Sequence, residues 1–150
     1  MTEFQNKMFL AACKSEGLTP VQEMVFGTEL NVRFRADYFF EGNNNKVAVE
    51  IDGGVWNNGR HNRASGYIEG MEKRNAYTLL KIHQLVFTVQ EIEKKPISII
   101  RAVKNALGLG IDAKFVFDSL YKENRAKRAK TIQQKRIKNY ELKKKLQDAK

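Results

Sequence analysis

Two carboxylates near the middle of the chain are spaced to meet on one face of a β-hairpin. Asp37 and Glu50 flank residues 42–45, Gly-Asn-Asn-Asn, a composition typical of a hairpin loop. With a four-residue loop, Glu41 pairs with Lys46. Counting back places Asp37 directly opposite Glu50, with Cβ atoms about 4.5–5.5 Å apart.

Side chains alternate between the two faces of a strand, so the same register predicts the composition of each face. The expected polar face holds Arg35, Asp37, Phe39, Ala48, Glu50 and Asp52. The expected core face holds Ala36, Tyr38, Phe40, Val47, Val49 and Ile51. One face is therefore expected to be apolar, and the other to gather three carboxylates.

Three neighbouring carboxylates repel one another unless a cation or shared protons compensate. A hard divalent ion is the natural partner, and we expect Mg²⁺, with Mn²⁺ as a substitute, bound by Asp37, Glu50 and the backbone carbonyl of Ile51. Such an ion can bind a phosphate oxygen and activate a water for hydrolysis. The alternative is a solvated sheet face, with these carboxylates paired to Arg35 and Lys46, or a register shifted by one residue.

The elements that must position this hairpin follow from caps, periodicity and turn residues. Apolar spacing after a Thr2/Gln5 capping box predicts a first helix over 3–16, and a second box at Thr88/Glu91 precedes an apolar helical stripe that ends at Gly108. The remaining expected elements are strands at 23–26, 32–40 and 46–51, a Gly/Asn-rich loop at 53–66, a helix at 67–80 and a strand at 85–89. The pattern predicts one mixed helix and sheet domain.

Charge divides the chain into two parts. Residues 1–118 contain 15 Lys/Arg and 14 Asp/Glu, whereas 119–150 contain 12 and 3, so the last segment carries +9 of the formal +10. We expect a domain at 1–118 and a basic C-terminal arm at 119–150, mobile or marginally helical because its apolar residues form no continuous stripe. A basic arm on a near-neutral body favours a polyanion partner, first nucleic acid and second an acidic membrane surface. The arm residues expected to contact phosphate are Lys127, Arg128, Lys130, Lys135 and Arg136.

The hairpin and the segments after it resemble a known family. Residues 35–39, Arg-Ala-Asp-Tyr-Phe, followed by 49–56, Val-Glu-Ile-Asp-Gly-Gly-Val-Trp, resemble the PD-(D/E)XK nuclease superfamily. Together with Gly59-Arg60-His61, Gly66-Tyr67, Glu72-Lys73, Asn75-Ala76 and Val86-Phe87-Thr88, they look like small phage-borne endonucleases distantly similar to very-short-patch repair endonucleases. The resemblance spans about residues 20–90. It implies an α/β (α+β) fold with a restriction-endonuclease-like core: a mixed four-stranded sheet flanked by helices, in αβββαβ order, followed by the basic arm.

The resemblance also implies residue roles. Asp37 and Glu50 would be metal ligands, and Asp52 stands where the superfamily often has a catalytic lysine. Lys73 on the following helix would supply that lysine, and an ordinary ion pair with Glu69 is the alternative. Glu23 would support the metal or position water, and the alternative is a solvent-facing strand residue.

The chain departs from the family pattern at two positions. Gly70 stands where an Asp is expected on the second helix, with Glu69 and Glu72 as substitutes. Lys81 stands where a turn glycine is usual. The first departure bears on catalysis, and the second on the junction between helix and strand.

The loop before the second helix adds nucleic-acid-binding candidates. Arg60 and Arg63 could contact phosphate, and His61 could do the same or assist proton transfer. The alternative for His61 is an exposed loop histidine. The lone Cys13 is expected to be a small core residue of the first helix.

Several functional classes lack their motifs in this sequence. It has no Gly-x-x-x-x-Gly-Lys phosphate loop, no Cys/His zinc spacing and no Gly-x-Ser-x-Gly elbow. Without an apolar signal core or a long apolar run, we expect a cytoplasmic protein, in the host cell if phage-encoded, without membrane association. Two functions remain: a magnesium-dependent endonuclease acting on DNA, or a catalytically weak or inactive nucleic-acid-binding module of the same fold. RNA is the alternative partner, and a homodimer is the alternative to a monomer.

Overall fold

The computed structural model describes residues 1–53 and 64–148. These residues form two compact units, Met1–Val116 and Phe117–Lys150. The first unit contains a four-stranded sheet in the order β1-β2-β3-β4. Its strands are β1 (Val21–Phe26), β2 (Phe34–Gly42), β3 (Asn45–Asp52) and β4 (Ile82–Thr88). β1, β2 and β3 pair antiparallel and β4 pairs parallel to β3, so the sheet is mixed.

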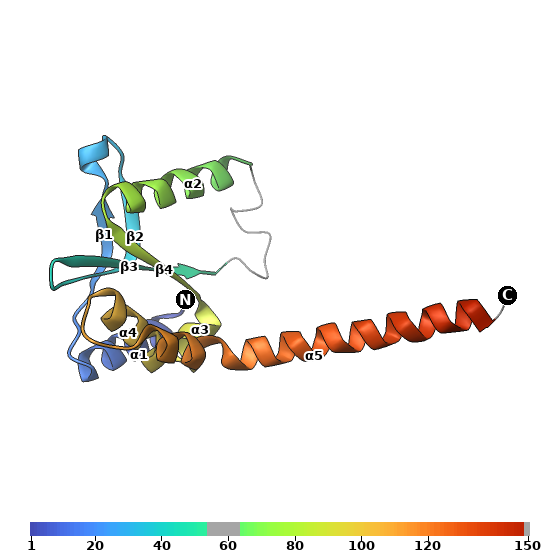
Figure 1. The fold of residues 1–150 in the computed structure, drawn as a ribbon. Coiled ribbons are helices and arrows are strands. Elements are labelled where there is room, and N and C mark those ends of the chain that lie inside the picture. The colour runs from blue at the N-terminus through green and yellow to red at the C-terminus, as the bar shows by residue number, and fades with distance from the viewer. Residues whose placement is uncertain (54–63, 149–150) are drawn as a thin grey trace. The chain divides into compact units, whose positions relative to one another are not determined.

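Helices cover both faces of the sheet (Figure 1). Helix α2 (Ala64–Leu79) lies on one face. The other face carries α1 (Glu3–Ser15), α3 (Val89–Lys94) and α4 (Pro96–Ala106), and a short 3-10 turn, η1 (Thr28–Leu30), connects β1 to β2. Both expected capping boxes are present, at Thr2/Gln5 and Thr88/Glu91. Cys13 is fully buried on α1 as expected, and burial raises the pKa of its thiol to about 12.

The hairpin has the predicted register but a tighter turn. Glu41 pairs with Lys46 and Tyr38 with Val49, which places Asp37 opposite Glu50 at the next step. The predicted four-residue loop is wrong, because Gly42 and Asn45 already pair and only Asn43 and Asn44 connect the strands. Both asparagines have positive φ, 50° and 60°, as a two-residue hairpin turn of the I′ kind requires.

The predicted division into one apolar face and one polar face is also wrong. Phe39 and Ala48, assigned to the polar face, are buried beneath α2 with Ala76 and Tyr77. Ala36 belongs to this same cluster, although strict alternation puts Ala36 and Phe39 on opposite faces. The alternation therefore breaks between them, at Asp37 and Tyr38. Both sheet faces are core, and the carboxylates lie at the margin of the α2 layer.

The helix-to-strand junction differs from prediction by a few residues. Helix α2 begins at Ala64 rather than 67, and β4 begins at Ile82 rather than 85. Lys81 has a φ of 55°, the left-handed conformation that glycine adopts most easily. The family pattern's turn glycine therefore matches a real backbone requirement, which Lys81 meets at a conformational cost.

The last element is a single long helix, α5 (Ala113–Asp148), rather than a marginal arm. Its many Ala, Lys, Arg, Gln and Glu residues are strong helix formers, which explains continuity without an apolar stripe. All side chains from 122 to 141 are exposed. Across the described ranges, 1–53 and 64–148, no helix has the length and apolar character to cross a membrane.

Candidate active site

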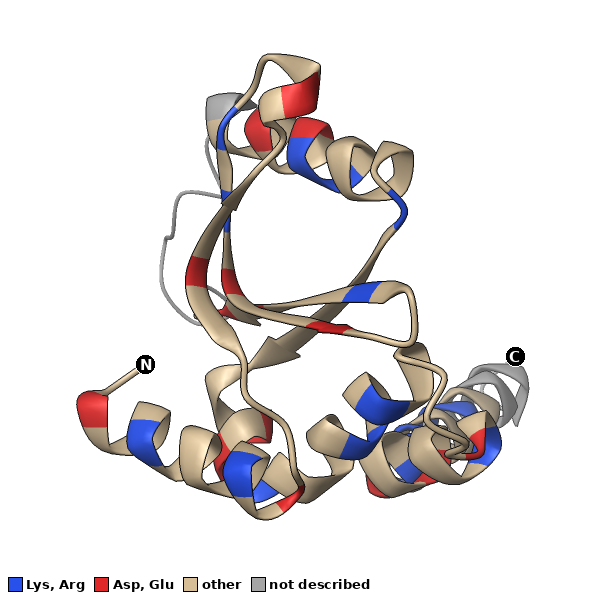
Figure 2. Cartoon of the chain, turned by 90° about the vertical axis from the view of Figure 1, so that its left-hand side faces the viewer, with Lys and Arg blue, Asp and Glu red and all other residues tan. Residues whose placement is uncertain are grey.

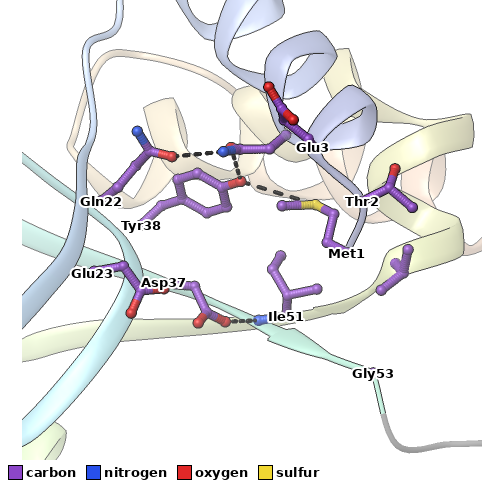
Figure 3. Close-up of a pocket in the computed structure, with 11 residues that line it drawn as sticks. Met1, Thr2, Glu3, Gln22, Glu23, Asp37, Tyr38, Ile51 and Gly53 are labelled. Carbon is purple, nitrogen blue, oxygen red and sulfur yellow. Dashed lines mark hydrogen bonds between the residues drawn. The ribbon is translucent and has the colours of Figure 1, made fainter.

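The side chain of Asp37 on β2 is held by a hydrogen bond from the backbone of β3. Its Oδ2 accepts from the backbone N–H of Ile51 at 2.6 Å, as Figure 3 shows. A short hydrogen bond from an N–H to a carboxylate is stronger than one between neutral groups. The carboxylate of Asp37 is therefore oriented toward the strand that carries Glu50.

Glu50 on β3 is engaged by two side chains from α2. Its Oε2 accepts from the Lys73 ammonium at 2.7 Å, and its Oε1 accepts from the Tyr77 hydroxyl. The side chains of Glu50 and Lys73 are only 15% and 23% exposed, so solvent screens this ion pair weakly. Sequence analysis predicted a role for Lys73 from the family resemblance, and the structure brings its ammonium to Glu50 rather than to Glu69.

Tyr77 was missed by the sequence analysis. It is 1% exposed, and its ring stacks on Phe26 with centroids 4.3 Å apart and planes 20° apart. Burial, and then the hydrogen bond to Glu50, raise the pKa of Tyr77 far above its ordinary value, so the phenol remains a donor. Its signal in the sequence was its position four residues after Lys73, because side chains at i and i+4 lie on one face of a helix.

The two carboxylates line one cavity together with basic side chains. This cavity, about 630 Å³, is bordered by Asp37, Glu50 and Ile51, by Glu69 and Lys73 of α2, by Arg33 just before β2 and by Arg35 on β2. In Figure 2 acidic segments lie on neighbouring strands of the sheet, and the helix above them carries both basic and acidic segments. The carboxylates of this cavity suit a divalent cation, and its basic side chains suit a phosphate.

Asp52 lies elsewhere than expected. It lines a second cavity of about 350 Å³ with Glu50, Gly70 and Lys73, but Asp37 borders only the first of these two. Within 1–53 and 64–148, no three His, Cys, Asp or Glu side chains are grouped to hold a metal. The expected group of three carboxylates is thus not formed: Glu50 is common to both cavities, with Asp37 at one and Asp52 at the other.

Glu23 lies on the other side of Asp37. It is ion-paired with Arg35 at 2.8 Å, its side chain is 58% exposed, and its φ is 53°. It borders a third cavity of about 480 Å³ with Asp37 and Tyr38, drawn in Figure 3. There the Tyr38 hydroxyl donates to Asn6, whose amide in turn donates to Gln22. Glu23 therefore shares a cavity with Asp37 but not with Glu50.

The alternative reading of the hairpin does not hold. Arg35 pairs with Glu23 and Lys46 with Glu41, at 2.8 Å and 3.8 Å, rather than with the two central carboxylates. The register is not shifted. The cation at Glu50 comes from another element, Lys73, so this part of the sheet is a partly buried charged site rather than a solvated face.

The oxygen donors at this site are of the kind that Mg²⁺ prefers, but they supply only part of its coordination shell. Mg²⁺ is usually held by one or two carboxylates and keeps several waters. Asp37 and Glu50 would supply the carboxylates, and Ile51 lines the same cavity.

The predicted nucleic-acid-binding residues fall into two groups. Arg60, His61 and Arg63 lie outside the described residues. The exposed face of α5 contains the rest of the predicted set: Lys127, Arg128, Lys130, Lys135 and Arg136. Comparison with known proteins gave no match to any family model, curated protein or solved structure.

Proposed function

We propose that this protein is a magnesium-dependent endonuclease that hydrolyses phosphodiester bonds in DNA. One observation carries the proposal: Asp37, Glu50 and Lys73 line a single cavity with Arg33 and Arg35. Acids that can hold a metal ion, beside cations that can stabilise a phosphate, suit the hydrolysis of a phosphodiester. The resemblance to PD-(D/E)XK nucleases supports the same assignment.

In this mechanism Asp37 and Glu50 would hold Mg²⁺, for which Mn²⁺ could substitute. When bound, the ion would supply Lewis acidity for activating a water. Lys73 places its ammonium at the scissile phosphate, where it stabilises developing negative charge. Arg33 and Arg35, which line the same cavity, orient the phosphate backbone.

Helix α5 contributes attraction to DNA rather than chemistry. Its exposed lysines and arginines neutralise phosphates and release counterions, a contribution that does not depend on base sequence. Tethered to the catalytic unit, they raise the local concentration of DNA. DNA is thus the proposed partner, and RNA would satisfy the same charge pattern.

A plasmid assay tests the activity. Supercoiled DNA incubated with the protein should be nicked or linearised with Mg²⁺ or Mn²⁺ and remain intact with EDTA. Asp37→Asn and Glu50→Gln should each abolish cleavage, since each removes one of two ligand charges. Glu41→Gln is the matched control, because Glu41 lies on the same hairpin, in an exposed ion pair with Lys46. Equal cleavage by all four proteins would show that another protein or another site is responsible.

A second candidate is a nucleic-acid-binding module without catalysis. It is favoured because no three acidic side chains within 1–53 and 64–148 are grouped to hold a metal, although Glu69 lines the cavity of Asp37 and Glu50. Gly70 stands where the family pattern has Asp, and Asp52 does not border that cavity. In that case DNA binding would persist, metal would have no effect, and Asp37→Asn would change nothing in the plasmid assay.

A further inference from the structure

Both oxygens of Glu50 are already occupied by donors from α2. Lys73 holds Oε2 at 2.7 Å, and Tyr77 holds Oε1. The carboxylate is 15% exposed, so little water competes with these two donors. Any cation that binds Glu50 must therefore displace one of them or share an oxygen with it.

The two donors differ in their freedom to move. The Tyr77 side chain is buried to 1% exposure, and its ring is fixed against Phe26. Moving it would disrupt the core cluster beneath α2. The Lys73 side chain is a flexible four-carbon stem, 23% exposed, at the border of the 630 Å³ cavity. Only Lys73 can leave at low cost.

We propose that Lys73 is a built-in counter-ion of Glu50, and that an incoming divalent cation displaces it from Oε2 while Tyr77 keeps Oε1 in place. This inference rests on the proposed function and adds to it the order of events at the site. Glu50 would bind the cation through Oε2, and Tyr77 is the positioning residue that holds the carboxylate while its partner changes.

The displaced ammonium has a defined destination. The cavity it borders is also lined by Arg33, Arg35 and one further acid, Glu69. A freed Lys73 adds a third cation to this cavity, where a phosphate would bind. Metal binding then creates positive charge on the phosphate side of the cavity. The exchange couples the two ligands, because each stabilises the arrangement in which Lys73 is released from Glu50.

The exchange predicts that Lys73 competes with metal in the free protein. Removing it should therefore tighten metal binding even as cleavage is lost. A lysine that merely orders the site predicts the reverse, since its removal would leave Glu50 less well placed. The two roles thus differ in the sign of one measurement.

Calorimetric titration of Mn²⁺ into the full chain measures this sign without depending on activity. Lys73→Met should bind Mn²⁺ about 5- to 150-fold more tightly than wild type, the range typical of coupling between two ligands. Lys46→Met is the matched control, because it removes the same charge from β3 at an exposed bridge to Glu41, and its affinity should stay close to that of wild type. A Lys73→Met affinity equal to that of the control, or weaker than wild type, would overturn the exchange.

A measurement on the wild-type protein removes any dependence on how the variants fold. Brief labelling with an amine-reactive reagent, read by mass spectrometry, reports how free each lysine is. Adding Mg²⁺ should increase labelling of Lys73 and leave Lys46 unchanged. Equal labelling of Lys73 with and without Mg²⁺ would contradict its release.

The outcomes separate this inference from the proposed function. If Lys73→Met binds Mn²⁺ more tightly but the wild-type protein does not cleave DNA, the exchange is supported and the nuclease function is rejected. Metal-dependent cleavage without any tightening would keep the nuclease and reject the exchange. Absence of Mn²⁺ binding by every variant would reject both.

Discussion

Replacing Tyr77 with Phe is the most selective perturbation of the site. The change removes a single oxygen, the donor to Oε1 of Glu50, and preserves the ring that stacks on Phe26. A hydrogen bond to a charged group contributes about 1.5–3 kcal/mol to stability, and an acceptor left partly buried without its donor gains little from water. We expect the free energy of unfolding to fall by about 1.5–3 kcal/mol.

Urea denaturation followed by circular dichroism measures this loss. With a slope of about 2 kcal/mol per molar, the midpoint should fall by about 0.8–1.5 M. Tyr67→Phe is the matched control, because Tyr67 lies on the same helix but is 57% exposed, and its loss should stay within about 0.5 kcal/mol. Tyr77→Leu also removes the ring stacking and should cost about 0.5–1.5 kcal/mol more than Tyr77→Phe. If Tyr77→Phe and Tyr67→Phe were equally stable, the hydroxyl would not hold Glu50 and the positioning role of Tyr77 would be refuted.

Four further predictions use other parts of the molecule. A Cβ added at Gly70 on α2 would meet open space, so Gly70→Ala should stabilise the fold by about 0.5–1 kcal/mol. Gly70→Asp should bind Mn²⁺ more tightly than Gly70→Ala, because the added carboxylate borders both cavities that Glu50 lines. Lys81→Gly should raise the free energy of unfolding by up to about 1 kcal/mol, since φ is 55° there; a lower urea midpoint would contradict this. Glu16 bonds Lys104 at 2.7 Å, which lowers its pKa from the ordinary 4.5. Its stabilising contribution should be complete above pH 4.5 and lost as pH falls through the lower folded value, so acid titration should bring the stabilities of wild type and Glu16→Gln together. Neutralising five exposed cations of α5 should weaken DNA binding and reduce the slope of log binding constant against log salt concentration by up to about 4.5, as measured by fluorescence anisotropy. An unchanged slope would show that α5 does not bind DNA. Each of these residues is changed to Gln: Lys127, Arg128, Lys130, Lys135 and Arg136.

The sequence alone determined the local features of the fold. Both capping boxes and the buried position of Cys13 on the first helix were predictable, because a cap depends on residues three positions apart and a helix stripe on residues within a few turns. The hairpin register was predictable for a similar reason, since the turn asparagines and the flanking alternation lie in one continuous segment.

The contacts that build the site were decided only by the tertiary structure. Glu50 meets Lys73 and Tyr77 across separations of 23 and 27 residues, and no local pattern specifies which face of α2 packs on which strand. The resemblance singled out Lys73, but not the buried Tyr77 that secures the same carboxylate.

The broken alternation in β2 is a further tertiary effect. A strict period of two predicted that Asp37, Glu50 and Asp52 share one polar face. With helices on both sides, Ala36 and Phe39 are buried in the same cluster, and Asp37 and Asp52 border different cavities. Burying apolar surface beneath α2 contributes about 25 cal/mol per Å² to stability. Summed over the cluster, this gain outweighs the cost of an irregular backbone at one position of β2. The sequence thus determined which residues could form the acidic site, and packing decided which of them meet.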